Sequence, residues 1–106
     1  MFAAVDLGSN SFRLHIGEYD GTTMRIVETA RDPIRLAAGL DARSSLTEAA
    51  MQSALQCLSS FRAILARYEL SAVRVVATNT LRVARNAQDF LPRAEAAIGY
   101  PIEIIS

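Results

Sequence analysis

Two short polar segments of the chain carry residue types that can hold an anion, and the first is Asp6-Leu7-Gly8-Ser9-Asn10-Ser11. Its glycine would let the backbone approach an anion closely, while backbone N–H groups and the serine and asparagine side chains offer donors. Asp6 could hold a hydrated magnesium ion through water, because Mg²⁺ prefers oxygen ligands and keeps several of its waters. A hairpin turn with an aspartate that caps its own loop has the same composition. This segment alone leaves both interpretations open.

The second polar segment covers residues 78–86 and begins directly after an apolar run, residues 72–77 (AVRVVA). Thr78 and Thr80 could donate their hydroxyl groups to a substrate, although such residues also satisfy backbone groups at strand ends. Further along, Arg85 is expected to be a solvated charge and Asn86 to cap a helix. What the two segments can do together depends on the elements that position them.

The residues around the first segment predict three strands joined by tight turns. Residues 2–7 form a short apolar run, residues 12–16 alternate between apolar and polar side chains, and residues 24–29 include β-branched residues. Asp20-Gly21 is a hairpin signal between the second and third runs. These features predict an antiparallel meander, followed by an ordered loop over residues 32–45.

From Leu46 the pattern changes to that of a long helix. Apolar residues recur every three or four positions and form one stripe that should cover a face of the sheet. The stripe consists of Met51, Leu55, Leu58, Phe61, Leu65 and Tyr68. Thr47 is the expected N-cap, because its hydroxyl can accept a hydrogen bond from a free N–H group of the first turn.

The last third of the chain alternates between strands and helices. It predicts a buried strand over residues 72–77, a short helix over 81–85, a helix from Asn86 to Ile98 and a strand over 101–105. Pro92 should either kink the longer helix or mark its first turn. Gly99 is the expected C-cap of that helix.

This order of elements predicts a single α/β domain over residues 1–106, with a mixed five-stranded sheet of order 3-2-1-4-5 and helices on its faces. Right-handed crossovers bring the fourth and fifth strands parallel to the first. In such sheets ligands gather outside the carboxyl ends of the parallel strands. The two polar segments, residues 6–11 and 78–86, are therefore expected to be neighbours in space.

Composition and charge argue against several classes of function. Eleven acidic residues cancel eleven basic ones, all of them arginine, so no net positive field would gather nucleic acid or a membrane surface. No apolar run approaches the roughly 20 residues of a membrane span. Cys57 is the only cysteine and cannot form an internal disulfide, which fits a cytoplasmic protein. His15 and Cys57 have no partner histidine and are expected to be structural.

Five segments follow one another along the chain: FAAVDLGSNSFRL, IRLAAGLD, LTEAAM, VVATNTLRVARN and YPIEIIS. In order and spacing they resemble the exopolyphosphatase and guanosine pentaphosphate phosphohydrolase family, and FAAVDLGSNSFRL looks like its first phosphate loop. The resemblance also places the chain in the wider superfamily of actin, sugar kinases and chaperone ATPases, and so implies a ribonuclease H-like fold. Ala37 and Ala38 stand where a glycine and an acidic residue are commoner, a form closer to the exopolyphosphatase branch.

The resemblance implies magnesium-dependent hydrolysis in a cleft between two lobes, with water attacking a terminal phosphoryl group. Asp6 matches the aspartate linked to the Mg²⁺ ion. Arg82 matches an arginine that faces the cleft, where it would stabilise charge on phosphate oxygens; its alternative is a surface ion pair. The residues that match the phosphate loop are Gly8, Ser9, Asn10 and Ser11.

The same resemblance implies that this chain is the N-terminal part of the first lobe of a larger phosphatase. In the family, the glutamate-rich segment that supplies the general base follows directly, and here it would lie beyond Ser106. The chain alone is therefore expected to be inactive, and the full-length enzyme is expected to form a homodimer.

Several functions remain open from the sequence. The leading one is removal of terminal phosphate from inorganic polyphosphate, and the nearest alternative is hydrolysis of the 5′-phosphate of guanosine pentaphosphate. A kinase or ATPase of the same superfamily ranks lower, because the SNSFRL continuation favours the phosphatase branch. An alternative of another class is a non-catalytic lobe that binds phosphate or self-associates through an exposed sheet edge.

Overall fold

A computed structural model describes residues 1–105 of the chain, so Ser106, the last residue of the YPIEIIS segment, lies outside the described residues. Its first three strands are β1 (Phe2–Leu7), β2 (Phe12–Tyr19) and β3 (Met24–Asp32), and they pair as the predicted antiparallel meander. Both β2 and β3 extend further than predicted. A register shift between Ile16 and Gly17 lets the pairing continue to the turn.

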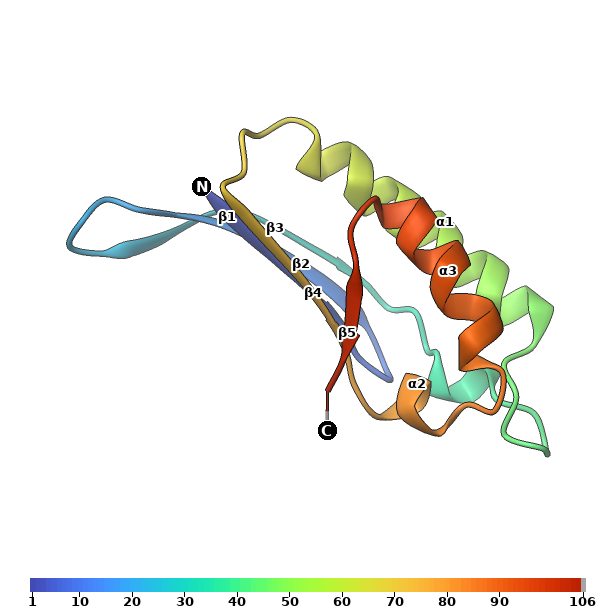
Figure 1. The fold of residues 1–106 in the computed structure, drawn as a ribbon. Coiled ribbons are helices and arrows are strands. Elements are labelled where there is room, and N and C mark those ends of the chain that lie inside the picture. The colour runs from blue at the N-terminus through green and yellow to red at the C-terminus, as the bar shows by residue number, and fades with distance from the viewer. Residues whose placement is uncertain (106) are drawn as a thin grey trace.

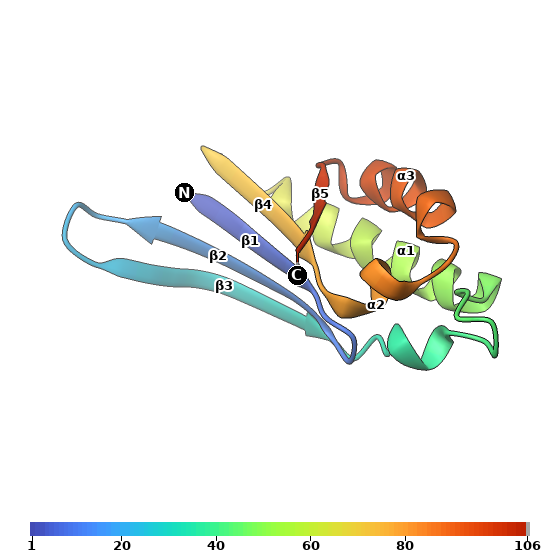
Figure 2. The same ribbon diagram turned by 60° about the horizontal axis from the view of Figure 1, so that its bottom comes forward.

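The remaining strands complete the predicted sheet. β4 (Ala72–Ala77) lies parallel to β1, and β5 (Ile102–Ile104) lies parallel to β4. The order is β3-β2-β1-β4-β5, which confirms the prediction (Figure 2). The carboxyl ends of β1 and β4 therefore lie next to each other, with Leu7 opposite Ala77.

Two long helices, α1 (Glu48–Leu65) and α3 (Ala87–Ile98), cover one face of the sheet (Figure 1). The other face carries no helix among residues 1–105. The exposed side chains of Asp6, Arg13 and His15 lie on it and alternate along β1 and β2 with buried side chains that face the helices. Burial of each large apolar side chain beneath the helices contributes roughly 1.5–3 kcal/mol. The fully buried ones include Val5, Leu7, Phe12, Leu14, Ile16, Leu58, Leu65, Val75, Leu81, Phe90 and Ile98.

The ends of the long helices confirm two predicted caps and correct a third. The Thr47 side chain accepts a hydrogen bond from the Ala50 N–H group, and Gly99 ends α3 with a left-handed φ of 86°. Asn86 occupies the N-cap position of α3, but its side chain makes no capping bond, so that prediction was wrong. The Asn86 amide instead forms hydrogen bonds with the backbone of Leu46. Pro92 lies inside α3 and not in its first turn.

Two short helical turns flank the strand ends. The predicted helix over residues 81–85 is α2 (Asn79–Val83), which begins two residues earlier because the chain turns directly after Thr78 and the Leu81 N–H group bonds the Thr78 carbonyl. Thr80 thus lies in a helical turn and not at a strand end. The predicted loop over residues 32–45 contains a 3₁₀ turn, η1 (Ala37–Gly39).

Candidate functional site

The two polar segments singled out in the sequence lie side by side at the carboxyl ends of β1 and β4. The Thr78 N–H group, just after β4, donates to the Leu7 carbonyl at 3.5 Å. One turn further, the Thr80 hydroxyl reaches Ser9 in the loop after β1. The predicted proximity of residues 6–11 and 78–86 is confirmed, because parallel pairing of β1 with β4 puts their ends at one edge of the sheet.

The loop of residues 8–11 is a tight turn between β1 and β2. The Gly8 N–H group bonds the Ser11 carbonyl at 3.1 Å, and a Cβ atom at Gly8 would lie 3.0 Å from that same oxygen. A larger residue would therefore crowd the turn. Among the hydrogen bonds formed within residues 1–105, none uses the N–H groups of Ser9, Asn10 or Ser11. Three successive backbone donors are thus available to an anion.

Ser9 is held from two directions. Its side-chain oxygen accepts a 2.7 Å hydrogen bond from the Thr80 hydroxyl of α2, and its carbonyl accepts a 3.1 Å bond from the Ala37 N–H group of η1. Thr80 is buried, with 4% of its surface exposed. The sequence analysis missed the contact with Ala37, because a backbone N–H group is present in almost every residue and residue type does not reveal its partner.

Arg82 is exposed on α2, two residues after Thr80. Its guanidinium donates to the Asn79 side-chain oxygen at 2.8 Å, which leaves most of its five N–H donors available. None of the four ion pairs formed within residues 1–105 includes Arg82. The surface ion pair considered as its alternative role is therefore absent from the described structure.

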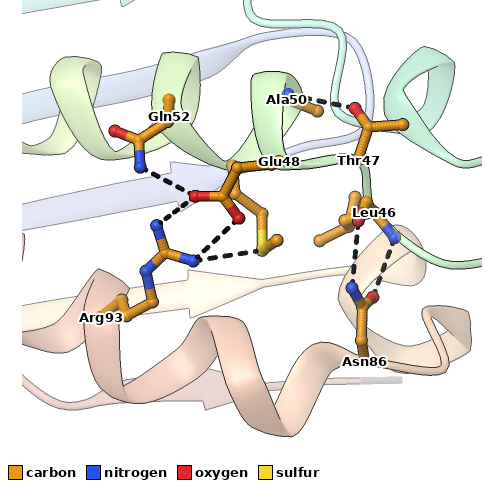
Figure 3. Close-up of polar contacts among 8 residues, drawn as sticks. Leu46, Thr47, Glu48, Ala50, Gln52, Asn86 and Arg93 are labelled. Atoms are coloured by element: carbon orange, nitrogen blue, oxygen red, sulfur yellow. Dashed lines mark hydrogen bonds and ion pairs between the residues drawn. The ribbon is translucent and has the colours of Figure 1, made fainter.

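A long loop, residues 33–46, is tied to the residues that follow α2. The Asn86 amide pairs with the Leu46 backbone in both directions: it accepts from the N–H group at 2.8 Å and donates to the carbonyl at 3.0 Å. Figure 3 shows this pair beside the N-terminus of α1. The Arg85 N–H group also donates to the Ser44 carbonyl at 2.9 Å. Asn86 therefore connects the loop carrying η1 to the segment carrying Arg82.

Asp6 lies one residue before the end of β1, with its side chain exposed on the helix-free face. Arg13 of β2 and Val76 of β4 are its neighbours across the strands. No cluster of three His, Cys, Asp or Glu side chains that could hold a metal occurs within residues 1–105. A hydrated Mg²⁺ ion needs only one or two carboxylates together with substrate phosphates, and Asp6 fits that need.

The strongest perturbations of pKa lie outside this site. Hydrogen bonds from Arg93 and Gln52 lower the pKa of Glu48 from 4.5 to about 2 (Figure 3). Burial, with a smaller contribution from Asp32, raises the pKa of the Cys57 thiol from 9.0 to about 12. Cys57 is buried, as expected of a structural residue, whereas His15 is exposed on the helix-free face of β2.

Comparison with known proteins identifies the family. The profile of the Ppx/GppA phosphatase family matches residues 15–106, which is most of the chain. The chain belongs to the Ppx/GppA phosphatase family. The profile match starts after the loop of residues 8–11, so likeness at that loop depends on comparison with solved structures.

The solved structures extend the match of this Ppx/GppA chain across both polar segments. The PPX-GPPA enzyme of Aquifex aeolicus is 28% identical, with a TM-score of 0.91 over 98% of this chain and 35% of its own. An exopolyphosphatase from Cytophaga hutchinsonii is 26% identical, with a TM-score of 0.91 over 98% of this chain and 33% of its own. The chain thus spans about a third of the length of these relatives.

More distant structures share the fold alone. RuvC of T. thermophilus, solved with a Holliday junction substrate, is 12% identical, with a TM-score of 0.51 over 98% of this chain and 62% of its own. Together with the sheet order, these matches confirm the ribonuclease H-like fold. No helix within residues 1–105 has both the length and the apolar character needed to cross a membrane.

Proposed function

We propose that this Ppx/GppA chain is the N-terminal part of the first lobe of an exopolyphosphatase, which removes the terminal phosphate of inorganic polyphosphate. One observation carries the proposal: the loop of residues 8–11 presents three backbone N–H donors while Ser9 is held between Thr80 and Ala37. A preorganised set of donors suits the negative oxygens of a terminal phosphoryl group. The 26% identical exopolyphosphatase from Cytophaga hutchinsonii supports this choice of substrate.

In this proposal, each residue of the site has a separate task. The N–H groups of the loop, together with the Ser9, Asn10 and Ser11 side chains, bind phosphate oxygens, and Gly8 allows the tight turn. Thr78, at the start of α2, contributes a hydroxyl group at the edge of this loop. Arg82 stabilises the charge on phosphoryl oxygens as water attacks.

Asp6 is the residue of this chain that would hold a magnesium ion, through the ion's water shell. When bound, Mg²⁺ neutralises part of the charge on the phosphate oxygens. Asp6 is exposed and takes part in none of the ion pairs formed within residues 1–105, so its carboxylate is available for that role.

The activity is proposed for a longer protein that includes this chain, because the chain spans only about a third of its solved relatives. No carboxylate of residues 1–105 other than Asp6 lies in the two polar segments, so the general base is proposed to come from outside them. The full-length enzyme is further proposed to be a cytoplasmic homodimer, which sedimentation of the purified protein would test.

The test is phosphate release by the full-length protein, measured separately with long-chain polyphosphate and with guanosine pentaphosphate, each with Mg²⁺ and with excess EDTA. Magnesium-dependent release mainly from polyphosphate is the expected result. Preference for the nucleotide would move the chain to the guanosine pentaphosphate branch of the family. Release from neither substrate would overturn both and favour a lobe that binds phosphate without cleaving it.

A further inference from the structure

Thr80 is the one buried residue with a polar side chain within residues 1–105. A buried hydroxyl group is costly unless it is hydrogen-bonded, and Thr80 meets this need through the Ser9 side-chain oxygen at 2.7 Å. The bond joins two residues that lie 71 positions apart in the chain.

The Thr80 hydroxyl is buried and bonds no acceptor other than Ser9 within residues 1–105, whereas Ser9 is only half-buried. A buried hydroxyl group needs an acceptor for its hydrogen, so Thr80 is the donor of this pair. A hydroxyl group has one hydrogen and two acceptor lone pairs. When Thr80 donates to the Ser9 oxygen, the hydrogen of Ser9 is left free to point elsewhere. Phosphate oxygens that carry negative charge can only accept. The Ser9 hydroxyl can therefore donate to the same anion as the backbone N–H groups of residues 9–11.

We propose that Thr80 is a positioning residue: it holds the Ser9 hydroxyl as a hydrogen-bond donor to a phosphate oxygen and does not itself contact the substrate. This inference rests on the proposed function of the loop as a phosphate site. It replaces the direct contact between Thr80 and substrate that the sequence suggested, because the single hydrogen of Thr80 is already used on Ser9.

The position of Thr80 gives the bond a second effect. Thr80 and Arg82 lie in the same short helix, whose end is closed by the Ala84 N–H group bonding the Thr80 carbonyl at 2.9 Å. The bond to Ser9 therefore also ties the helix that carries Arg82 to the phosphate loop. A bond of this kind keeps donors from the two segments at a fixed separation, which binding and catalysis both require.

The test combines Thr80→Val, Thr80→Ser, Ser9→Ala and the double variant Ser9→Ala/Thr80→Val in the full-length enzyme. Thr80→Val keeps the shape but removes the donor, and we expect kcat/KM with polyphosphate to fall about tenfold. Thr80→Ser should recover most of this loss. In the Ser9→Ala background, Thr80→Val should cause no further loss, because the two residues act as one unit. An unchanged kcat/KM in Thr80→Val, or two independent and additive losses, would overturn the inference.

Thr47→Val is the matched control. It also removes a threonine hydroxyl that makes one hydrogen bond, in this case the cap of α1, but Thr47 does not touch the phosphate loop. It should lower stability and leave kcat/KM unchanged. If Thr80→Val does not fold, Thr80→Cys takes its place, because the thiol keeps a small side chain with a weaker donor.

Binding of tripolyphosphate, measured by calorimetry, separates this inference from the proposed function. If the wild-type protein cleaves neither substrate but binds tripolyphosphate, and Thr80→Val and Ser9→Ala weaken binding equally, the proposed function fails and the positioning role stands. If the wild-type protein cleaves polyphosphate while Thr80→Val binds and cleaves like it, the function stands and the positioning role fails.

Discussion

The carboxyl ends of β1 and β4 and the turn between β2 and β3 are held in different ways. At the carboxyl ends of β1 and β4, hydrogen bonds between distant segments hold the chain: Thr80 bonds Ser9 and Asn86 bonds Leu46. At the other end, the hairpin of β2 and β3 projects beyond the rest of the sheet (Figures 1 and 2). Its turn uses only local bonds, such as those from the Thr22 and Thr23 N–H groups to the Asp20 carboxylate.

The hairpin also exposes apolar side chains, whereas the candidate site buries a polar one. Tyr19, Met24 and Ile26 are 62%, 55% and 52% exposed, and Thr80 is 4% exposed. A buried polar group is stable only when its partner is in place, so the candidate site tolerates little movement. The turn of the hairpin is held by local bonds and can open without disturbing the rest of the fold. This contrast predicts that the candidate site is more rigid than the hairpin turn.

The largest effect is expected from Arg82→Ala. This change removes a positive charge from the candidate site and breaks none of the ion pairs formed within residues 1–105. Phosphate release by the full-length enzyme should fall roughly tenfold to a thousandfold, while folding is retained. Steady-state kinetics and circular dichroism together check this. The matched control is Arg67→Ala, which removes an arginine that pairs with Glu28 and lies outside the two polar segments. This variant should leave the rate unchanged. An unchanged rate in Arg82→Ala would end its catalytic assignment.

Asn86→Ala should cause the largest loss of stability among these changes. It breaks both bonds to the Leu46 backbone and leaves a buried N–H group and carbonyl without their partner, at a cost of about 2 kcal/mol. Urea unfolding would measure this loss. Gln88→Ala, a change at an exposed position of α3 two residues further along, is the control and should be nearly neutral. Equal midpoints for the two variants would show that the loop does not depend on Asn86.

At the hairpin, Gly21→Ala should cost about 1 kcal/mol, because Gly21 has a φ of 94° and side chains rarely adopt that conformation. A Cβ atom there would meet nothing within 4 Å, so the loss is purely conformational. Gly21→Asn should lose less, since asparagine tolerates left-handed backbone better than alanine. Urea unfolding again gives the measurement, and phosphate release should stay at the wild-type rate. A slower rate would mean that the two ends are coupled.

The smallest effect concerns pH. Hydrogen bonds from Arg93 and Gln52 lower the pKa of Glu48 from 4.5 to about 2 in the folded protein. The folded pKa is below the unfolded one, so the stabilisation is present above about pH 4.5 and is lost as the pH falls towards 2. The difference in unfolding free energy between wild type and Arg93→Ala should therefore shrink over this range. Both side chains are partly exposed, so 1 M salt should also reduce it. A difference independent of pH would contradict this origin.

The fold was predictable because its determinants are local in sequence. Alternating burial in β2, the apolar stripe of α1 and the Asp20-Gly21 turn each lie within one short window. The strand order then followed from right-handed crossovers. Thr47 and Gly99 were identified as caps for the same reason, since a cap bonds residues of its own helix.

The candidate site was only partly predictable because its bonds connect distant residues. Proximity of the two polar segments followed from topology, but the partners of Thr80 and Asn86 did not. The Thr80 bond spans 71 positions and the Asn86 bonds span 40. Asparagine before a helix is a sound prediction of a cap, yet here a tertiary contact competes for the same amide. The preference of asparagine for capping its own helix was overridden by the Leu46 backbone, a partner that the sequence does not reveal.

Labelling of Cys57 offers a way to measure how often the core around α1 opens. The thiol of this α1 residue is buried, and burial raises its pKa to about 12. The thiolate is the reactive form, so a thiol reagent at pH 8 should react mainly with molecules in which Cys57 has become exposed. Because residues 1–106 contain no other cysteine, the labelling rate of this chain then reports how often Cys57 becomes exposed.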